Sequence, residues 1–409
     1  MARNKLLPAL TLVLALLAAC SAQSSPATPI LQAATPAAGT PVPSLPAAPV
    51  PSATERPSPP ALPAVAAPTL AHIDFQDSQD GWGLAIDGKG HVLRTVDGGS
   101  TWLDATPPGI GNIGLTTVLS VLDTNHAWVL VPGTDFFSGS LYRTRDGGLS
   151  WSSNTLPFGG AYLQFIDSNT GRALAERGAR AGSEAVELFQ TLDGGASWTS
   201  VFHDDPGQPG ASDSLPLAGI KNGMTFLDGN TGWVTGSSMT DGDIYLYVTH
   251  DGGVSWSQQS VPLPAGYQAE RSMPQAPVFF GKQGFLPLTI YLPGKAVLSF
   301  YTSLDGGATW NGDPAEAGKT IRPGLVAFSD ASHGYCWDGG PIMYQISDGA
   351  RTWTQLATHL DLSGELAQME FVPDASGPPA GWALTQVNDS GHSQLYQIAA
   401  GLQWKPVNP

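Results

Sequence analysis

Short apolar segments alternate with glycine-rich and acidic turns from about residue 71 to the C-terminus. Residues 141–144 (Leu-Tyr-Arg-Thr) and 244–248 (Ile-Tyr-Leu-Tyr-Val) carry the aromatic and β-branched side chains that favour strands. No segment outside the N-terminus keeps the apolar period of about 3.6 residues that marks an amphipathic helix. The pattern predicts an all-β body.

One octapeptide, Thr-Val-Asp-Gly-Gly-Ser-Thr-Trp at residues 95–102, recurs along this body, and a last copy keeps only Gly401 and Trp404. The copies return roughly every 50 residues, a period typical of four-stranded propeller blades. Each closing indole is large enough to be buried between neighbouring blades. We therefore expect burial of Trp102, Trp151, Trp198, Trp256, Trp310 and Trp353.

A second repeat lies upstream of each octapeptide: an apolar strand, an acidic turn, and then an aromatic residue, as in Asp77 to Trp82. Blade three has Arg172 in the aromatic position. Each of the two repeats occurs seven times. They predict a seven-bladed β-propeller of four-stranded antiparallel blades over residues 71–409, with strand A ending at the acidic turn and strand D leaving from the tryptophan.

The residue types of the octapeptide suit a hairpin turn. A short aspartate before two glycines hydrogen-bonds nearby backbone N–H groups, and the glycines adopt positive φ. We interpret the aspartates as structural, because six separate turns cannot form one active site; calcium ligation or acid catalysis is the alternative. The set is Asp97, Asp146, Asp193, Asp251, Asp305 and Asp348.

The octapeptide resembles the Asp-box, or BNR repeat, of sialidases, xyloglucan-cleaving endoglucanases, sortilin-type receptors and propellers similar to the photosystem II stability and assembly factor. The last group matches best, with seven blades and little outside them. Sialidases bind their substrate with an arginine before the first box, and no arginine lies between residues 57 and 93. The assembly factor is associated with an arginine-rich patch, whereas this chain offers only the group Arg172, Arg177 and Arg180 in blade three.

The N-terminus has a separate character. A basic start, an apolar run over residues 6–19 and the sequence Leu17-Ala18-Ala19-Cys20 resemble the bacterial lipoprotein signal peptide. The resemblance implies that residues 1–19 are removed and that Cys20 is lipidated, anchoring the exported chain to the outside of the cell membrane. A simple secretory signal or an uncleaved anchor is the alternative.

Residues 20–70 follow as an expected disordered stalk rich in proline and alanine, with a reach on the order of 100 Å when extended. The formal net charge of −16 argues against a nucleic-acid partner. Contact with the membrane is expected only through the lipid on Cys20.

Catalytic signatures are missing from the sequence. The eight histidines are scattered, and the sequence shows no cysteine cluster, phosphate-binding loop or nucleophile elbow. Cys336, between aromatic residues, is interpreted as an inert buried thiol rather than a nucleophile. No catalytic residue, metal site or cofactor is therefore predicted.

In a propeller, the A–B and C–D turns share one face, and the B–C and D–A loops form the other. The second set is irregular here, at residues 135–137, 176–180, 203–221 and 262–277, and such loops are either functional or tolerated insertions. The candidate binding residues are Phe136, Phe137, Arg177, Arg180, Asp204, Asp205, Tyr267, Glu270 and Arg271.

Two functions remain open. The first is a non-enzymatic platform at the cell envelope that binds or assembles protein or glycan partners. The second is a glycoside-active enzyme or carbohydrate binder that uses loop carboxylates, such as Asp204 or Asp205 with Glu270. Solvated loop charge is the plain alternative for those three residues.

Overall fold

The computed structural model describes residues 62–238, 240, 242–263, 271–312, 324–338, 342–356, 366–374, 378–388, 391–399 and 403–407. The chain divides into residues 1–59 and residues 60–409, and the description below concerns the second unit. The expected signal peptide, Cys20 and the stalk up to residue 61 lie outside the described residues. Within the described ranges, no helix is long and apolar enough to cross a membrane.

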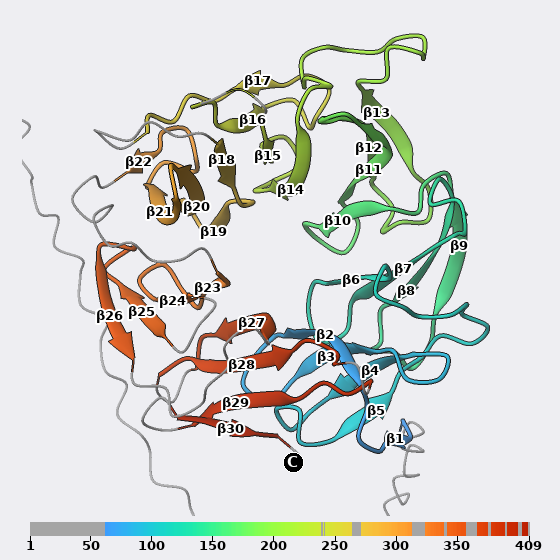
Figure 1. The fold of residues 1–409 in the computed structure, drawn as a ribbon. Helices are drawn as coiled ribbons and strands as arrows, with labels where there is room; N and C mark the ends of the chain where they lie inside the picture. The colour runs from blue at the N-terminus through green and yellow to red at the C-terminus, as the bar shows by residue number, and fades with distance from the viewer. Residues whose placement is uncertain are drawn as a thin grey trace, which may run out of the picture. The chain divides into compact units, whose positions relative to one another are not determined.

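Seven antiparallel sheets stand around a ring, and the first long strand of each lies nearest the centre (Figure 1). The strands of blades one to three are β1 (Ala64–Val65), β2 (Leu70–Phe75), β3 (Gly81–Ala85), β4 (His91–Thr95), β5 (Trp102–Asp104), β6 (Val118–Val121), β7 (Ala127–Pro132), β8 (Gly139–Thr144), β9 (Ser152–Leu156), β10 (Ala161–Phe165), β11 (Gly171–Arg180), β12 (Ser183–Thr191) and β13 (Thr199–His203). Blades four and five contain β14 (Ile220–Phe226), β15 (Gly232–Ser237), β16 (Tyr245–Thr249), β17 (Ser257–Gln258), β18 (Arg271–Pro274), β19 (Val278–Phe280), β20 (Gln283–Leu292), β21 (Lys295–Ser303) and β22 (Asn311–Gly312). Blades six and seven contain β23 (Val326–Phe328), β24 (Gly334–Trp337), β25 (Met343–Ser347), β26 (Thr352–Leu356), β27 (Leu366–Val372), β28 (Ala380–Thr385), β29 (Leu395–Ala399) and β30 (Gln403–Pro406). The predicted seven-bladed propeller of four-stranded blades is confirmed.

Two blades depart from the plain four-strand pattern. In blade one, β1 pairs with the outer edge of β5. In blade five, β18 and β19 both pair with β20, so the innermost strand is interrupted. Arg271 therefore lies in a strand, and the expectation that residues 262–277 form one loop is wrong. Residues 176–180 are likewise the end of β11 rather than a loop, because they pair with β12.

The expected assignment of the two faces is confirmed by backbone hydrogen bonds. In blade one, Gly98 N donates to Gln79 O of the A–B turn at 2.8 Å, and Gly147 N donates to Asn125 O at 3.0 Å in blade two. On the other face, Glu184 N donates to Leu217 O at 2.9 Å, which joins a B–C hairpin to a D–A loop. The octapeptide turns thus lie opposite the irregular loops.

In the five full octapeptide copies, the aspartate accepts the same two hydrogen bonds from the Ser or Thr four residues on. In blade four, Asp251 Oδ1 accepts from Ser255 N at 2.9 Å, and Asp251 Oδ2 accepts from the Ser255 hydroxyl at 2.6 Å. Thr249 donates its hydroxyl to Asp251 Oδ1 and accepts from Gly253 N. The equivalent bonds lower the pKa of Asp305 to about 2, the Thr309 hydroxyl contributing most.

The aromatic row of the B strands forms the core between blades. The buried members are Trp82, Trp128, Trp233, Phe285, Tyr335 and Trp382. Trp128 Nε1 donates to Gly194 O of the next blade at 2.9 Å. Arg172, in the equivalent position, donates from Nε to Gly252 O at 3.2 Å and lies over the Phe226 ring. This guanidinium therefore replaces an indole in both its hydrogen bond and its ring contact.

The closing tryptophans of the octapeptides are less uniformly buried than expected. Trp102, Trp256 and Trp310 are at most 8% exposed, whereas Trp151, Trp198 and Trp353 are half-buried. Trp151 and Trp198 directly precede the outermost strands β9 and β13 of their blades, and Trp353 is the second residue of the outermost strand β26. Trp151 still donates from Nε1 to Ala105 O of the previous blade at 2.8 Å.

Side chains close the ring between blades seven and one. The rings of Phe75 and Trp382 stack with centroids 3.6 Å apart. Gln368 Oε1 accepts from Ile73 N at 3.0 Å, and Glu370 Oε1 accepts from Phe75 N at 2.8 Å. Burial raises the pKa of Asp74 to about 7. Burial, followed by repulsion from Asp74, also raises the pKa of Glu370.

We expect replacement of Asp251 by alanine to lower the free energy of unfolding by about 1 kcal/mol, because the side chain caps its turn with two hydrogen bonds to Ser255. For a chain of this size, the melting temperature would fall by about 2 °C. Calorimetry against Asp213→Ala, which removes an exposed loop carboxylate, tests this expectation. Equal melting temperatures for the two variants would contradict a capping role.

Candidate functional site

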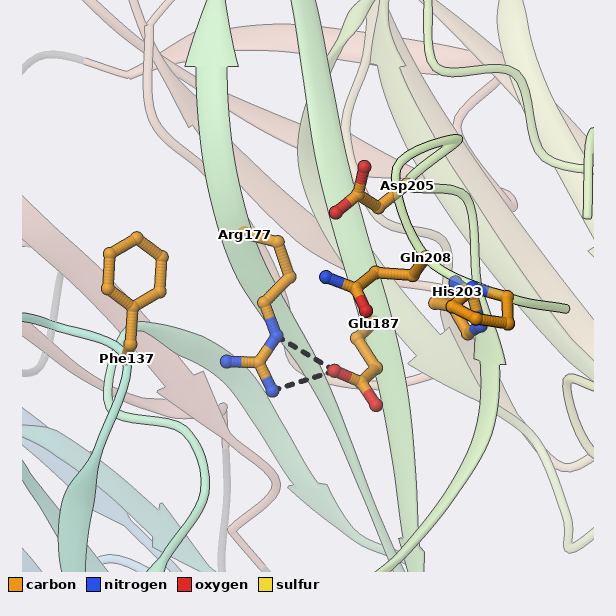
Figure 2. Close-up of a pocket in the computed structure, with 7 residues that line it drawn as sticks. Phe137, Arg177, Glu187, His203, Asp205 and Gln208 are labelled. Carbon is orange, nitrogen blue, oxygen red and sulfur yellow. Dashed lines mark hydrogen bonds and ion pairs between the residues drawn. The ribbon is translucent and has the colours of Figure 1, made fainter. Parts of the chain in front are cut away.

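A cavity of about 470 Å³ lies where the irregular loops of blades two and three meet (Figure 2). It receives side chains from the β7–β8 loop, from β11, β12 and the end of β13, and from the start of the β13–β14 loop. The lining residues are Phe137, Arg177, Glu187, His203, Asp205, Gln208 and Pro209. We call this cavity the loop pocket.

A turn stabilised by hydrogen bonds to Asp135 carries Phe136 and Phe137, of which Phe137 lines the pocket. Asp135 Oδ1 accepts from the backbone N–H groups of Phe137 and Ser138, both at 3.1 Å. The Ser138 hydroxyl, followed by these N–H groups, lowers the pKa of Asp135. Phe136 has a φ of 60°, and its carbonyl accepts from Gly159 N and Gly160 N. The two rings, 47% and 51% exposed, are therefore held in place without being buried.

A β-bulge positions Arg177. The pairing of β11 with β12 shifts between Glu176 and Gly178, which leaves Arg177 without a partner across the ladder. Its Nη2 lies 2.7 Å from Glu187 Oε2 on β12 and donates to Pro157 O at 2.9 Å. The guanidinium also lies over the Phe189 ring, 5.3 Å from the centroid. Arg177 is thus fixed in the pocket wall, with its charge already compensated.

A buried ionic cluster anchors the loop that completes the pocket. Lys221 Nζ lies 3.3 Å from Asp204 Oδ2 and donates to Glu184 O at 2.6 Å. Asp204 Oδ1 accepts from Val186 N at 2.7 Å, and Glu184 Oε2 accepts from Lys221 N at 2.6 Å. Burial lowers the pKa of Lys221 and raises those of Asp204 and Glu184. We call Glu184, Asp204 and Lys221 the anchor cluster.

The position of Asp204 corrects two expectations. It is only 5% exposed, so it is neither solvated loop charge nor a carboxylate that a sugar can reach. Asp204 holds the start of the β13–β14 loop against β12, because its backbone N–H also donates to Val186 O at 3.3 Å. The function of this carboxylate is structural.

The next residues turn toward the pocket. Asp205 Oδ1 accepts from Gly207 N at 2.9 Å, and Asp205 O accepts from Gln208 N at 3.0 Å. His203 O accepts from Ser212 N, while its buried Nδ1 has no hydrogen-bond partner among the described residues. Figure 2 shows Asp205 and Gln208 on the opposite side of Arg177 from Phe137.

The pocket gathers three of the expected binding residues, namely Phe137, Arg177 and Asp205. Arg180 lies at the exposed end of β11, and Arg271 stacks over Tyr291 in blade five. Tyr267 and Glu270 lie outside the described residues. Glu187, His203, Gln208 and Pro209 were not among the expected binding residues, although the last three lie within the irregular segment 203–221 and Glu187 shares a hairpin with Arg177.

The loop pocket offers binding groups rather than an acid–base pair. Glycoside cleavage normally requires a carboxylic acid with a raised pKa next to a second carboxylate. Within the described ranges, carboxyl groups with raised pKa values belong to the blade seam or to the anchor cluster. Those ranges also contain no group of three or more His, Cys, Asp or Glu residues arranged to hold a metal ion.

Cys336 is buried in blade six, far along the chain from this pocket. Burial raises the pKa of its thiol to about 12. Its Sγ lies 3.8 Å from Trp337 O.

The known proteins that are similar to this chain share its fold, but some are enzymes and one was solved with a bound peptide. No protein-family model matches the chain. A xyloglucanase of a Paenibacillus species is 28% identical over 258 residues, which are 54% of this chain and 23% of that protein. The chain thus spans about a quarter of the length of this curated relative.

Solved structures of two kinds share the propeller. YCF48 bound to a D1 peptide superposes with a TM-score of 0.50 at 16% identity, over 83% of this chain and 98% of that one. A GH74 enzyme of Niastella koreensis gives a TM-score of 0.55 at 14% identity, over 84% and 55% of the two chains. The GH74 xyloglucanase of Xanthomonas campestris gives 0.52 at 15% identity, over 84% and 55%. At these identities, the comparisons establish the propeller fold alone.

Proposed function

We propose that this protein is an exported, lipid-anchored propeller that binds a protein or glycan partner in the loop pocket and does not act as an enzyme. The observation that carries the proposal is the pocket itself. It combines an exposed aromatic ring, a fixed guanidinium and polar side chains from several segments in a cavity of about 470 Å³. Ligand sites have volumes of roughly 300–1,000 Å³ and combine apolar walls with a few placed polar groups.

Two further observations support binding without catalysis. The pocket carboxylates are engaged locally, Glu187 by Arg177 and Asp205 by Gly207 N. YCF48, which has a similar propeller, has been solved with a bound peptide. The first observation argues against acid–base chemistry in the pocket, and the second supports a protein partner for a propeller of this kind.

Cleavage of a glycan is the second candidate function, and the xyloglucanase relative favours it. We expect the purified propeller to release no reducing ends from xyloglucan above the level of a heat-denatured sample. Release that disappears in an Asp205→Asn variant would establish the enzyme and overturn the non-catalytic proposal.

We expect Phe137→Ala to reduce capture of the partner from the native envelope by about tenfold, because its exposed ring lines the loop pocket and is available for an aromatic contact. Leu115→Ala is the matched control, since Leu115 is exposed but lies in the blade-one loop, away from this pocket. Quantitative proteomics of cross-linked complexes measures both variants. Equal losses, or none, would remove the loop pocket as the binding site.

The anchor is tested separately. Cys20→Ser should abolish labelling of the protein by a radioactive or clickable fatty acid, because the thiol is the proposed acceptor in the run Leu17-Ala18-Ala19-Cys20. Cys336→Ser serves as the control, since it removes the other cysteine of the chain. Unchanged labelling of the Cys20 variant would contradict the lipoprotein assignment.

A further inference from the structure

We propose that the loop pocket takes a lysine or arginine side chain from a segment of the partner, with Asp205 as its charge partner and Phe137 as its ring contact. This inference rests on the proposed function and specifies what the pocket receives.

The pocket contains one uncompensated charge. Glu187 Oε2 lies 2.7 Å from Arg177 Nη2, so this pair cancels. Asp205 Oδ1 accepts from Gly207 N at 2.9 Å, and within the described part of the chain no cationic side chain forms an ion pair with it. The half-buried Asp205 carboxylate therefore remains available to a cation from outside.

The charges of the pocket side chains favour a cationic ligand over an anionic or a neutral one. A phosphate or carboxylate would meet two carboxylates and only one guanidinium, which is already paired. A neutral sugar would hydrogen-bond to Asp205 without neutralising it. A cation would gain Coulomb attraction in a partly desolvated site and would be drawn there by the net charge of −16.

The ring supplies the second contact. Phe137 is 51% exposed and lies on the other side of Arg177 from Asp205 (Figure 2). The aliphatic stem of a lysine or arginine lies favourably along such a ring. The exposed side-chain amide of Gln208 is a polar group that suits the backbone of a bound segment.

A random peptide library selected on the wild-type propeller tests the inference. The selected peptides should be enriched in lysine and arginine, and their Kd should rise about tenfold in Asp205→Asn, because a charge-assisted contact is lost. Acetylation of the selected lysine should raise the Kd similarly. Asp213→Asn is the matched control: it removes the same charge from an exposed position in the same loop and should leave the Kd nearly unchanged.

Selection of peptides without basic residues would overturn the inference, as would an equal Kd for wild type and Asp205→Asn. Binding of xyloglucan oligosaccharides that is lost in Phe137→Ala, with no peptide selected, would overturn the inference but leave the proposed function standing. Binding of both ligand classes that is unaffected by Phe137→Ala would overturn both.

Discussion

Replacing Asp204 by alanine is expected to lower the free energy of unfolding by about 3–5 kcal/mol, because the buried ammonium group of Lys221 loses its ion-pair carboxylate and keeps only backbone carbonyl oxygens such as those of Glu184 and Pro216. For a propeller of this size, the melting temperature would fall by about 10 °C. The loss should be accompanied by loss of partner binding, since Asp204 also holds the loop that carries Asp205 and Gln208. Chemical denaturation and binding measured below the transition test both expectations.

A double variant separates the buried charge from the shape of the loop. Asp204→Asn with Lys221→Met removes both charges of the ion pair but keeps a side-chain acceptor for Val186 N, and it should be more stable than Asp204→Ala. Asp205→Ala, one residue along and half-buried, should change stability by less than about 1 kcal/mol. If Asp204→Ala is as stable as Asp205→Ala, the anchor cluster does not hold this loop.

The seam between blades seven and one should lose stability as the pH rises. The pKa of Asp74 is raised by burial to about 7, and that of Glu370 is raised by burial and by Asp74. A carboxyl group with a raised pKa in the folded state is most favourable when protonated. Its contribution is complete below the unfolded pKa of about 4 and is lost as the pH passes through about 7.

We expect Asp74→Asn to remove most of this loss and to stabilise the protein at pH 8 by on the order of 2 kcal/mol relative to wild type. The two proteins should differ little at pH 4. Thermal unfolding across this pH range measures the difference, with Asp213→Asn as the control for loss of one negative charge. Parallel curves for wild type and Asp74→Asn would show that the seam carboxyls keep ordinary pKa values.

The number of blades could be predicted because each blade contains its own copy of a short sequence motif. The octapeptide aspartates bond within their own turns, as Asp251 does with Ser255 four residues away. All the groups that stabilise such a turn lie within a few residues of one another, so the motif can be recognised in the sequence. Arg172 also kept its place in the repeat, although only the structure shows that it replaces an indole as a donor to the next blade.

The pocket could be predicted only in part. Phe136 and Phe137 stood out as apolar residues in an irregular loop, and they are exposed. The position of Arg177 depends on a β-bulge beside Gly178, whose φ is 122°. The glycine was a possible signal of the bulge, but the sequence pattern indicated a loop for this segment. Asp204 and Asp205 are adjacent, and no local pattern reveals that the first is buried against Lys221 while the second faces the pocket.

Photo-cross-linking from single positions tests most directly whether the loop pocket is the binding surface. A photoreactive amino acid in place of Gln208 lies in the pocket, and one in place of Leu304 lies on an octapeptide turn of the opposite face, where Leu304 is 70% exposed. We expect the partner to cross-link from position 208 and not from position 304. Cross-linking from position 304 alone would contradict it and would place binding on the face of the octapeptide turns.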